Sequence, residues 1–251
     1  MDLGLTDRVY LVTGGARGLG RATADVLVAE GARVVLSGRT EASLASARAA
    51  LGDAVETVVA DNADAATPER LVAAATTRWG RLDGALVSVG GPPKGPVTGI
   101  TDQQWSEAFG AVFLGAVRLG REIGRILPSG GSLAFVLSSS VRAPLAEMAI
   151  SNGLRPGLAM VAKTLADELG PAGVRVNGLL PGRVGTERVA ELDAASGDAE
   201  AARQAAVRTI PLGRYGEPEE FGRVAAFLLS PAASFVSGAM VPVDGGMLRA
   251  L

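Results

Sequence analysis

The chain has 251 residues, of which 48% are hydrophobic and 20% are charged, and its formal net charge is −2. A mean hydropathy of +0.29 excludes a disordered chain, and a pI of 5.4 with scattered arginines argues against a nucleic-acid-binding surface. Cysteine and histidine are both absent, which excludes disulfides, a cysteine–zinc site and a histidine general base.

The sequence predicts a cytoplasmic protein that acts on a small molecule. Residues 1–7 contain neither a basic stretch nor an apolar core, so they are unlike a signal peptide. No apolar run reaches the ~18–20 residues that a membrane helix needs. We therefore expect no membrane partner, no nucleic-acid partner and no metal in the functional site.

Apolar, β-rich runs alternate with helical stretches along the whole chain. Strands are expected, in chain order, at residues 8–13, 33–37, 56–60, 83–89, 132–138, 174–180 and 240–243. Helices are expected between them at residues 19–30, 41–51, 68–79, 102–127, 145–169 and 218–229. This alternation predicts an α/β fold in one domain over residues 1–251, with a doubly wound parallel sheet of about seven strands and helices on both faces.

A glycine-rich loop follows the first expected strand and opens the first expected helix. It reads Thr-Gly-Gly-Ala-Arg-Gly-Leu-Gly over residues 13–20. Gly14 suits a tight turn, Gly18 lets the backbone approach a pyrophosphate, and Gly20 allows close packing of the helix. The helix N-terminus then offers free N–H groups to the anion. Glycine turns are common, so the alternative is an ordinary turn, but the strand–turn–helix context favours a dinucleotide site.

The spacing of this loop, together with later motifs, resembles the short-chain dehydrogenase/reductase family, whose fold is Rossmann-like. The resemblance covers nearly the whole chain, and bacterial β-ketoacyl carrier-protein reductases are the nearest general match. The further matching segments are Asp61-Asn62, residues 175–178, Pro181-Gly182, Thr186, residues 211–214, residues 216–220, Ser237-Gly238 and residues 243–246.

The resemblance implies a nicotinamide cofactor. The residues that match the family's cofactor-binding positions are Gly14, Ala16, Arg17, Gly18, Leu19, Arg39, Asp61, Asn62, Gly90, Arg155, Pro181, Gly182, Val184 and Thr186. At the end of the second strand, Arg39 stands where an NAD enzyme would usually have a carboxylate. Arg39 and Arg17 can pair with a 2′-phosphate, which favours NADP(H), although both are also compatible with solvated surface arginines.

The family's catalytic asparagine, serine, tyrosine and lysine are not all present at the matching positions. Ser138 matches the serine, and it lies thirteen residues before Ser151, which stands at the tyrosine position. Arg155 stands at the lysine position, and Val112 stands at the asparagine position. A serine hydroxyl is too weak an acid to replace tyrosine without a base, and arginine stays protonated and cannot relay a proton. We expect Ser138, Ser151 and Arg155 to form an atypical catalytic set.

Few other side chains can supply a proton. Lys94 follows the fourth strand, and Glu147 precedes the helix of Ser151; each is compatible with a solvated surface role. Tyr10 belongs to the expected core of the first strand, and Tyr215 precedes the last helix in a structural context. Lys163 stands at a routine basic position on the helix of Arg155.

Two functions remain open from the sequence. One is a divergent NADP(H)-dependent oxidoreductase that transfers hydride to a small carbonyl or imine-type substrate without the usual tyrosine–lysine acid. The other is a catalytically silent nucleotide-binding or scaffold protein on the same fold.

The Ala-rich, charged segment at residues 191–208 interrupts the strand–helix rhythm, within a possible substrate lid at residues 183–213. It is either a surface helix with a loop or a mobile substrate lid, since it follows the carboxyl end of a strand. The resemblance also implies a homotetramer, or a homodimer, in which helices 102–127 and 145–169 pair across an interface. Helix 102–127 is apolar over a broader arc than one sheet face needs.

Overall fold

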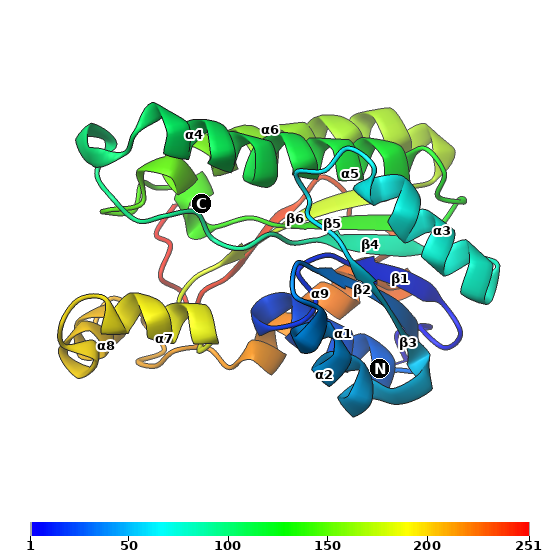
Figure 1. Cartoon of the computed structure of the whole chain (residues 1–251), viewed down its shortest axis with the longest axis horizontal. Coiled ribbons are helices and arrows are strands. Elements are labelled where there is room, and N and C mark those ends of the chain that lie inside the picture. Colours follow the sequence, from blue (N-terminus) through cyan, green and yellow to red (C-terminus); the bar gives the residue numbers. More distant parts are fainter. Residues whose placement is uncertain (1, 251) are drawn as a thin grey trace.

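The computed structural model describes residues 2–250, and its centre is a parallel sheet with the strand order β3-β2-β1-β4-β5-β6-β7 (Figure 1). The strands are β1 (Val9–Val12), β2 (Arg33–Gly38), β3 (Val55–Val59), β4 (Gly84–Val87), β5 (Ser132–Val136), β6 (Arg175–Pro181) and β7 (Met240–Val243). The order reverses between β1 and β4. In open α/β sheets, ligands bind at such a switch point, beyond the carboxyl ends of the strands.

Helices cover both faces of the sheet (Figure 1). One face carries α1 (Gly18–Ala29), α2 (Glu41–Leu51) and α9 (Pro218–Leu229). The other face carries α3 (Thr67–Trp79), α4 (Asp102–Ala108), α5 (Gly115–Gly124) and α6 (Ala149–Leu169). The expected fold class is therefore confirmed.

The side chains of β1 contribute to two hydrophobic cores, one on each face of the sheet. Val9 and Leu11 belong to the core under α3, α5 and α6, whereas Tyr10 and Val12 belong to the core under α1 and α9. Successive strand residues point to opposite faces, so a strand covered on both sides must be apolar throughout. All four residues of β1 and all five of β5 are buried.

Two expected helices differ from the structure. The helix expected at 102–127 is interrupted by a π-helical segment, Phe109–Leu114, and its last α-helical residue is Gly124. The helix expected at 145–169 begins only at Ala149. The side chain of Asn152 holds the preceding turn, accepting a hydrogen bond from the Leu145 amide (3.0 Å) and donating to the Leu145 carbonyl (2.8 Å).

The strands expected at 83–89 and 132–138 are also shorter, because their last residues leave the ladder and enter the loops of the candidate site. Ser138 is extended but already caps a short 3₁₀ turn, Ser139–Val141. Polar residues at these two strand ends belong to the loops. Hydropathy alone does not show where each strand ends and its loop begins.

The segment at 183–213 contains two helices, α7 (Glu187–Ala194) and α8 (Ala199–Val207), which stand apart from the sheet layers beyond the end of β6 (Figure 1). Between them, α7 and α8 bury only one residue, Asp193. Within residues 2–250, no helix combines the length and apolar character needed to cross a membrane.

Candidate functional site

The glycine-rich loop lies at the switch point between β1 and β4. Gly14 and Gly18 have φ values of 59° and 57°, in the left-handed region that favours glycine. A Cβ at Gly20 would lie 2.5 Å from the Gly14 carbonyl oxygen, so only glycine lets α1 start this close to the loop. The roles expected for Gly14 and Gly20 thus match the backbone geometry.

The start of α1 is open to an anion. Arg17 is extended at the N-cap, no side chain caps the helix, and its first turn contains no acidic residue. Amide groups at an uncapped helix N-terminus carry partial positive charge and bind phosphate groups. The tight loop and the open helix end therefore fit the pyrophosphate of a dinucleotide, with Ala16 and Leu19 at its flanks.

A buried hydrogen-bond network joins this loop to β4. Thr13 Oγ1 donates to the Ser88 carbonyl (2.6 Å) and accepts from the Ser88 amide (2.8 Å). The buried Asn62 side chain donates to the same Ser88 carbonyl (3.1 Å), while the neighbouring Asp61 is exposed and accepts from the Ala63 amide (2.9 Å). Of the pair expected at adenine, Asn62 has its amide group turned inward, and Asp61 is the one whose side chain faces solvent.

The two arginines expected at a 2′-phosphate differ in their surroundings. Arg39 follows β2 and is exposed. Arg17 is also exposed, but its guanidinium lies 3.8 Å from the carboxylate of Glu191 on α7. The contact between Arg17 and Glu191 joins segments far apart in sequence, and no local pattern could have revealed it.

The serines that follow β5 and the serine at the start of α6 form a cluster of side-chain hydroxyls. Ser138 Oγ accepts a hydrogen bond from the Ser140 amide (3.1 Å), which leaves its own proton free to donate. Ser140 Oγ lies 3.0 Å from Ser151 Oγ, and both residues are buried, with exposed fractions of 4% and 3%. Our sequence reasoning missed Ser140; the only signal for it was the run of three serines at 138–140.

Arg155 follows Ser151 by one turn on α6, so both side chains lie on the same buried side of the helix. Its guanidinium donates to the Val136 carbonyl at 2.7 Å, at the end of β5. No carboxylate of residues 2–250 forms an ion pair with it within 4 Å. Burial alone lowers the pKa of Arg155 to about 10, so the side chain remains a cation at neutral pH. It can donate hydrogen bonds but cannot act as a base there.

The other candidate proton donors are either held by hydrogen bonds to the protein or exposed to solvent. Tyr10 is buried, its hydroxyl donates to the Leu229 carbonyl (3.4 Å), and burial raises its pKa to about 12. Tyr215 donates to Asp193 Oδ2 (3.0 Å), and its pKa is raised by desolvation and then by that bond. Lys163 donates to the Gly238 carbonyl (3.2 Å), whereas Lys94 and Glu147 are exposed.

The expected relay position offers no polar group. Val112 lies in the π-helical segment and is buried, with an exposed fraction of 3%. A valine side chain cannot hold a water molecule by hydrogen bonding.

The remaining expected residues surround the same strand ends. Gly90 follows β4 and is exposed, with no atom within 4 Å of the position a Cβ would take. Pro181 ends β6, and the Gly182 amide donates to the Val243 carbonyl (3.0 Å). Val184 is buried and bridges to Gly216. Thr186 caps α7 and lies beside the glycine-rich loop of residues 13–20, which is called the phosphate loop below. The methyl carbon of Thr186 lies 3.7 Å from where a Cβ of Gly18 would be.

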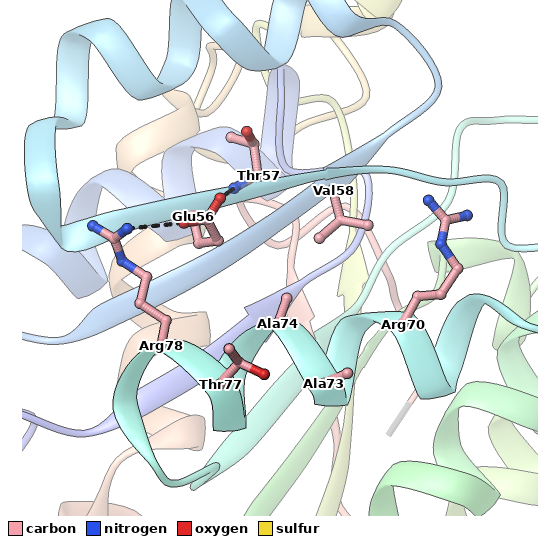
Figure 2. A pocket seen from close by; sticks show the side chains of 8 residues that line it. All are labelled: Glu56, Thr57, Val58, Arg70, Ala73, Ala74, Thr77 and Arg78. Atoms are coloured by element: carbon pink, nitrogen blue, oxygen red, sulfur yellow. Dashed lines mark hydrogen bonds and ion pairs between the residues drawn. The ribbon is translucent and has the colours of Figure 1, made fainter.

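A hollow of about 640 Å³ lies elsewhere, between β3 and α3 (Figure 2). Arg70 and Arg78 stand at its two ends, and Glu56 contacts Arg78 at 2.9 Å. None of the residues expected in the cofactor or catalytic sets lines this hollow. We therefore place the candidate site at the strand ends around the glycine-rich loop.

Comparison with known proteins identifies the family of the chain. A family model described as enoyl-(acyl carrier protein) reductase matches residues 14–248. Levodione reductase of Leifsonia aquatica is 38% identical over 257 residues, covering 98% of this chain and 96% of that protein. The L-rhamnose 1-dehydrogenase (NAD(P)⁺) of Azotobacter vinelandii is 34% identical over 261 residues, covering 97% of each chain.

The fold is also similar to solved structures over its whole length. The crystal structure of L-sorbose reductase from Gluconobacter frateurii, complexed with NADPH and L-sorbose, superposes with a TM-score of 0.93 at 28% identity, with 100% of both chains covered. With the family model matched over most of the chain and relatives above 30% identity along nearly all of it, this chain belongs to the short-chain dehydrogenase/reductase family of oxidoreductases.

Proposed function

We propose that the protein is an NADP(H)-dependent oxidoreductase that transfers hydride to a small carbonyl or imine-type carbon without a tyrosine–lysine acid. One observation carries the proposal: the side chains at positions 151 and 155, beside the end of β5, are a buried serine and a buried arginine. The two tyrosines of the chain, Tyr10 and Tyr215, and Lys163 hold hydrogen bonds to Leu229, Asp193 and Gly238. The other lysine, Lys94, is exposed on the loop that pairs with the start of α6.

Arg39 and Arg17 support the choice of phosphorylated cofactor. Both are exposed arginines, one beside the phosphate loop and the other at the end of β2, where the 2′-position of the adenosine ribose would lie. The planar guanidinium fork suits a phosphate. The NADPH-bound structural neighbour is consistent with this choice.

A reduced nicotinamide supplies a hydride, and the residues of this chain have to position and polarise the acceptor. Ser138 has a free proton, and the Ser151 hydroxyl has one when Ser140 Oγ donates to Ser151 Oγ (3.0 Å) rather than to the Ser151 carbonyl (3.4 Å). Arg155 adds a fixed positive charge nearby. These groups can polarise a substrate oxygen, but none has a pKa suited to deliver a proton at neutral pH.

An iminium carbon needs no enzymic acid, because the cationic C=N bond becomes a neutral amine when it takes up the hydride. We therefore expect a cyclic iminium ion to be reduced faster than the ketone of the same ring size. The kcat/KM for the imine should fall as the pH rises through the pKa of the imine itself, since no enzyme group sets the proton supply.

The experiment measures NADPH oxidation with matched cyclic imines and ketones between pH 6 and 9, after NADPH binding has been established by fluorescence titration. A ketone rate equal to the imine rate throughout would contradict the proposed chemistry. Tight NADPH binding without oxidation by any substrate in a broad panel would instead identify a silent nucleotide-binding protein.

A further inference from the structure

Helix α7 presents two carboxylates to the phosphate loop. Glu187 and Glu191 are one turn apart, so they share a face of the helix. Glu191 Oε1 lies 3.8 Å from the Arg17 guanidinium. Glu187 Oε2 would lie 3.9 Å from a Cβ placed on Gly18, the first residue of α1. Negative charge from α7 therefore lies beside the positive start of α1.

The carboxylates of α7 supply the negative charge that the phosphate loop and the first turn of α1 lack within their own segment. The first turn of α1 has no acidic residue and no side-chain cap, and Arg17 forms its ion pair with Glu191. A helix N-terminus and an adjacent arginine favour a nearby anion. The carboxylates of α7 satisfy that preference in the structure.

The same face of α7 is tied to the loop after β4. Glu191 Oε2 also lies 3.6 Å from Arg188, and Arg188 donates to the Pro92 carbonyl at 3.1 Å. Pro92 is buried, whereas Glu191 is about half exposed. Contacts of Arg188 thus join the Arg17–Glu191 pair to the loop that follows β4.

We infer that Glu187 and Glu191 act as an internal counter-ion for the phosphate loop, which the phosphates of the nucleotide have to displace, so that these two residues set cofactor affinity. The inference rests on the proposed function, because it takes the loop to be the dinucleotide site. A phosphate group brought to Arg17 and the start of α1 is repelled by both carboxylates. Removing their charge should therefore strengthen binding of a phosphate-bearing ligand.

The test compares Glu191→Gln, Glu187→Gln and the double variant with wild type by fluorescence titration of NADPH and by calorimetry with 2′,5′-ADP, which lacks nicotinamide. Each single change should tighten NADPH binding about two- to fivefold at low ionic strength, as expected for exposed charges. The gain should shrink in ~0.5 M salt, which screens such interactions. Glu200→Gln on α8 is the matched control, since the Glu200 carboxylate is exposed and accepts a hydrogen bond from Gln204 on its own helix (2.9 Å), and this variant should bind like wild type.

Trypsin cleavage after Arg188 gives a readout independent of affinity. If the nucleotide displaces Glu191 from Arg17, saturating NADPH should change the cleavage rate in wild type and change it less in the double variant. Unchanged or weakened NADPH binding in both single variants would overturn the inference, while tight wild-type binding would leave the proposed function standing. Failure of wild type and of every variant to bind either ligand would contradict both.

Discussion

At the scale of single residues, the feature that concerns the candidate site is a buried cation, Arg155, that forms no ion pair within residues 2–250. Arg155 is 4% exposed and is held by one backbone carbonyl. Burying a charge without a counter-ion is costly. The other buried arginine, Arg175, offsets this cost with bonds to the Leu228, Val236, Leu229 and Ser230 carbonyls, whereas Arg155 has one such bond. Arg155 lies one turn after Ser151 on α6, and we propose that it serves the nicotinamide ribose and the substrate.

Replacing Arg155 with methionine should raise stability and lower function together. The change removes the buried charge while keeping most of the side-chain volume, so the free energy of unfolding should rise by about 1–3 kcal/mol. NADPH binding should weaken, because a ribose contact is lost. Arg155→Lys is the control: it keeps the charge and should bring no such gain in stability.

The pH dependence of that gain follows from the pKa of Arg155. Because burial lowers the pKa from 12.5 to about 10, the folded protein holds fewer protons than the unfolded chain only above about pH 9. The charge therefore opposes folding throughout pH 6–9, and its cost is relieved only as the pH rises through the folded pKa. Thermal melts should show a constant advantage of Arg155→Met over pH 6–9; an advantage that varies within this range would mean that another group is responsible.

Arg39 gives the corresponding prediction for cofactor choice. Arg39→Ala should weaken NADPH binding by at least about tenfold and leave NADH binding almost unchanged, since a charge-assisted contact to a phosphate contributes ~1.5–3 kcal/mol. Arg48→Ala is a fair control, because Arg48 is a basic residue of α2 that pairs with Glu56 at 3.5 Å. Equal affinities of the wild type for NADPH and NADH would contradict the proposed preference for NADP(H).

At the scale of elements, the strands and the phosphate loop were predictable because their signals are local. An apolar run bounded by glycine marks a buried strand, and the spacing of Gly14, Gly18 and Gly20 marks the turn. The π-helical segment Phe109–Leu114 was not predictable, since its apolar pattern is also that of an α-helix. Gly115, the residue that follows this segment, packs directly against the Asn62 carbonyl, with no room for a side chain.

The contacts of α7 were equally invisible to the sequence, because they join residues that are far apart along it. Asp193 illustrates this, because its carboxylate accepts hydrogen bonds from Arg183 (3.1 Å) and from the Tyr215 hydroxyl (3.0 Å). Asp193 is also the buried residue of α7. A charged residue on an amphipathic surface helix gives no hint of such an anchor. We propose that this anchor holds the 183–213 segment as a lid.

Asp193→Ala should loosen α7 and α8 without unfolding the sheet. The change leaves the Tyr215 hydroxyl and Arg183 without their partner, which costs about 1–3 kcal/mol in local stability. Hydrogen exchange should therefore accelerate roughly tenfold or more across 187–207, while the amides of β1 and β5 keep their protection. Glu200→Ala, at an exposed position of α8, should leave exchange unchanged. Equal acceleration in the central strands would show that Asp193 supports the whole fold.

At the scale of the whole molecule, one helical face remains apolar and exposed. Phe109, Leu114 and Met160 are 46%, 42% and 67% exposed, and they come from the π-helical segment and α6. Phe109 also stacks on Phe113, with ring centroids 5.3 Å apart. Exposed apolar side chains that gather on neighbouring helices are typical of an interface. This supports our proposal that the protein forms a homotetramer, or a homodimer, through these helices.

Light scattering at micromolar concentration should therefore give a mass above that of the 25.3 kDa chain. Met160→Glu should shift the protein to a smaller species, because it places a charge in the apolar face. Val59→Glu changes an exposed residue at the β3 edge and should leave the assembly intact. A monomeric wild type would contradict the proposed assembly.

We propose that Ser151 and Arg155 stand in place of a tyrosine–lysine pair and cannot deliver a proton as that pair would. The most direct measurement is kcat/KM for NADPH-dependent reduction of a simple β-ketoester by wild type and by the Ser151→Tyr, Arg155→Lys double variant. General acid catalysis contributes ~10²–10⁴-fold, so the double variant should be markedly faster, with only partial recovery because Val112 holds no relay water. A wild type as fast as an ordinary member of the family, losing its activity in Lys94→Ala or Glu147→Gln, would contradict the claim.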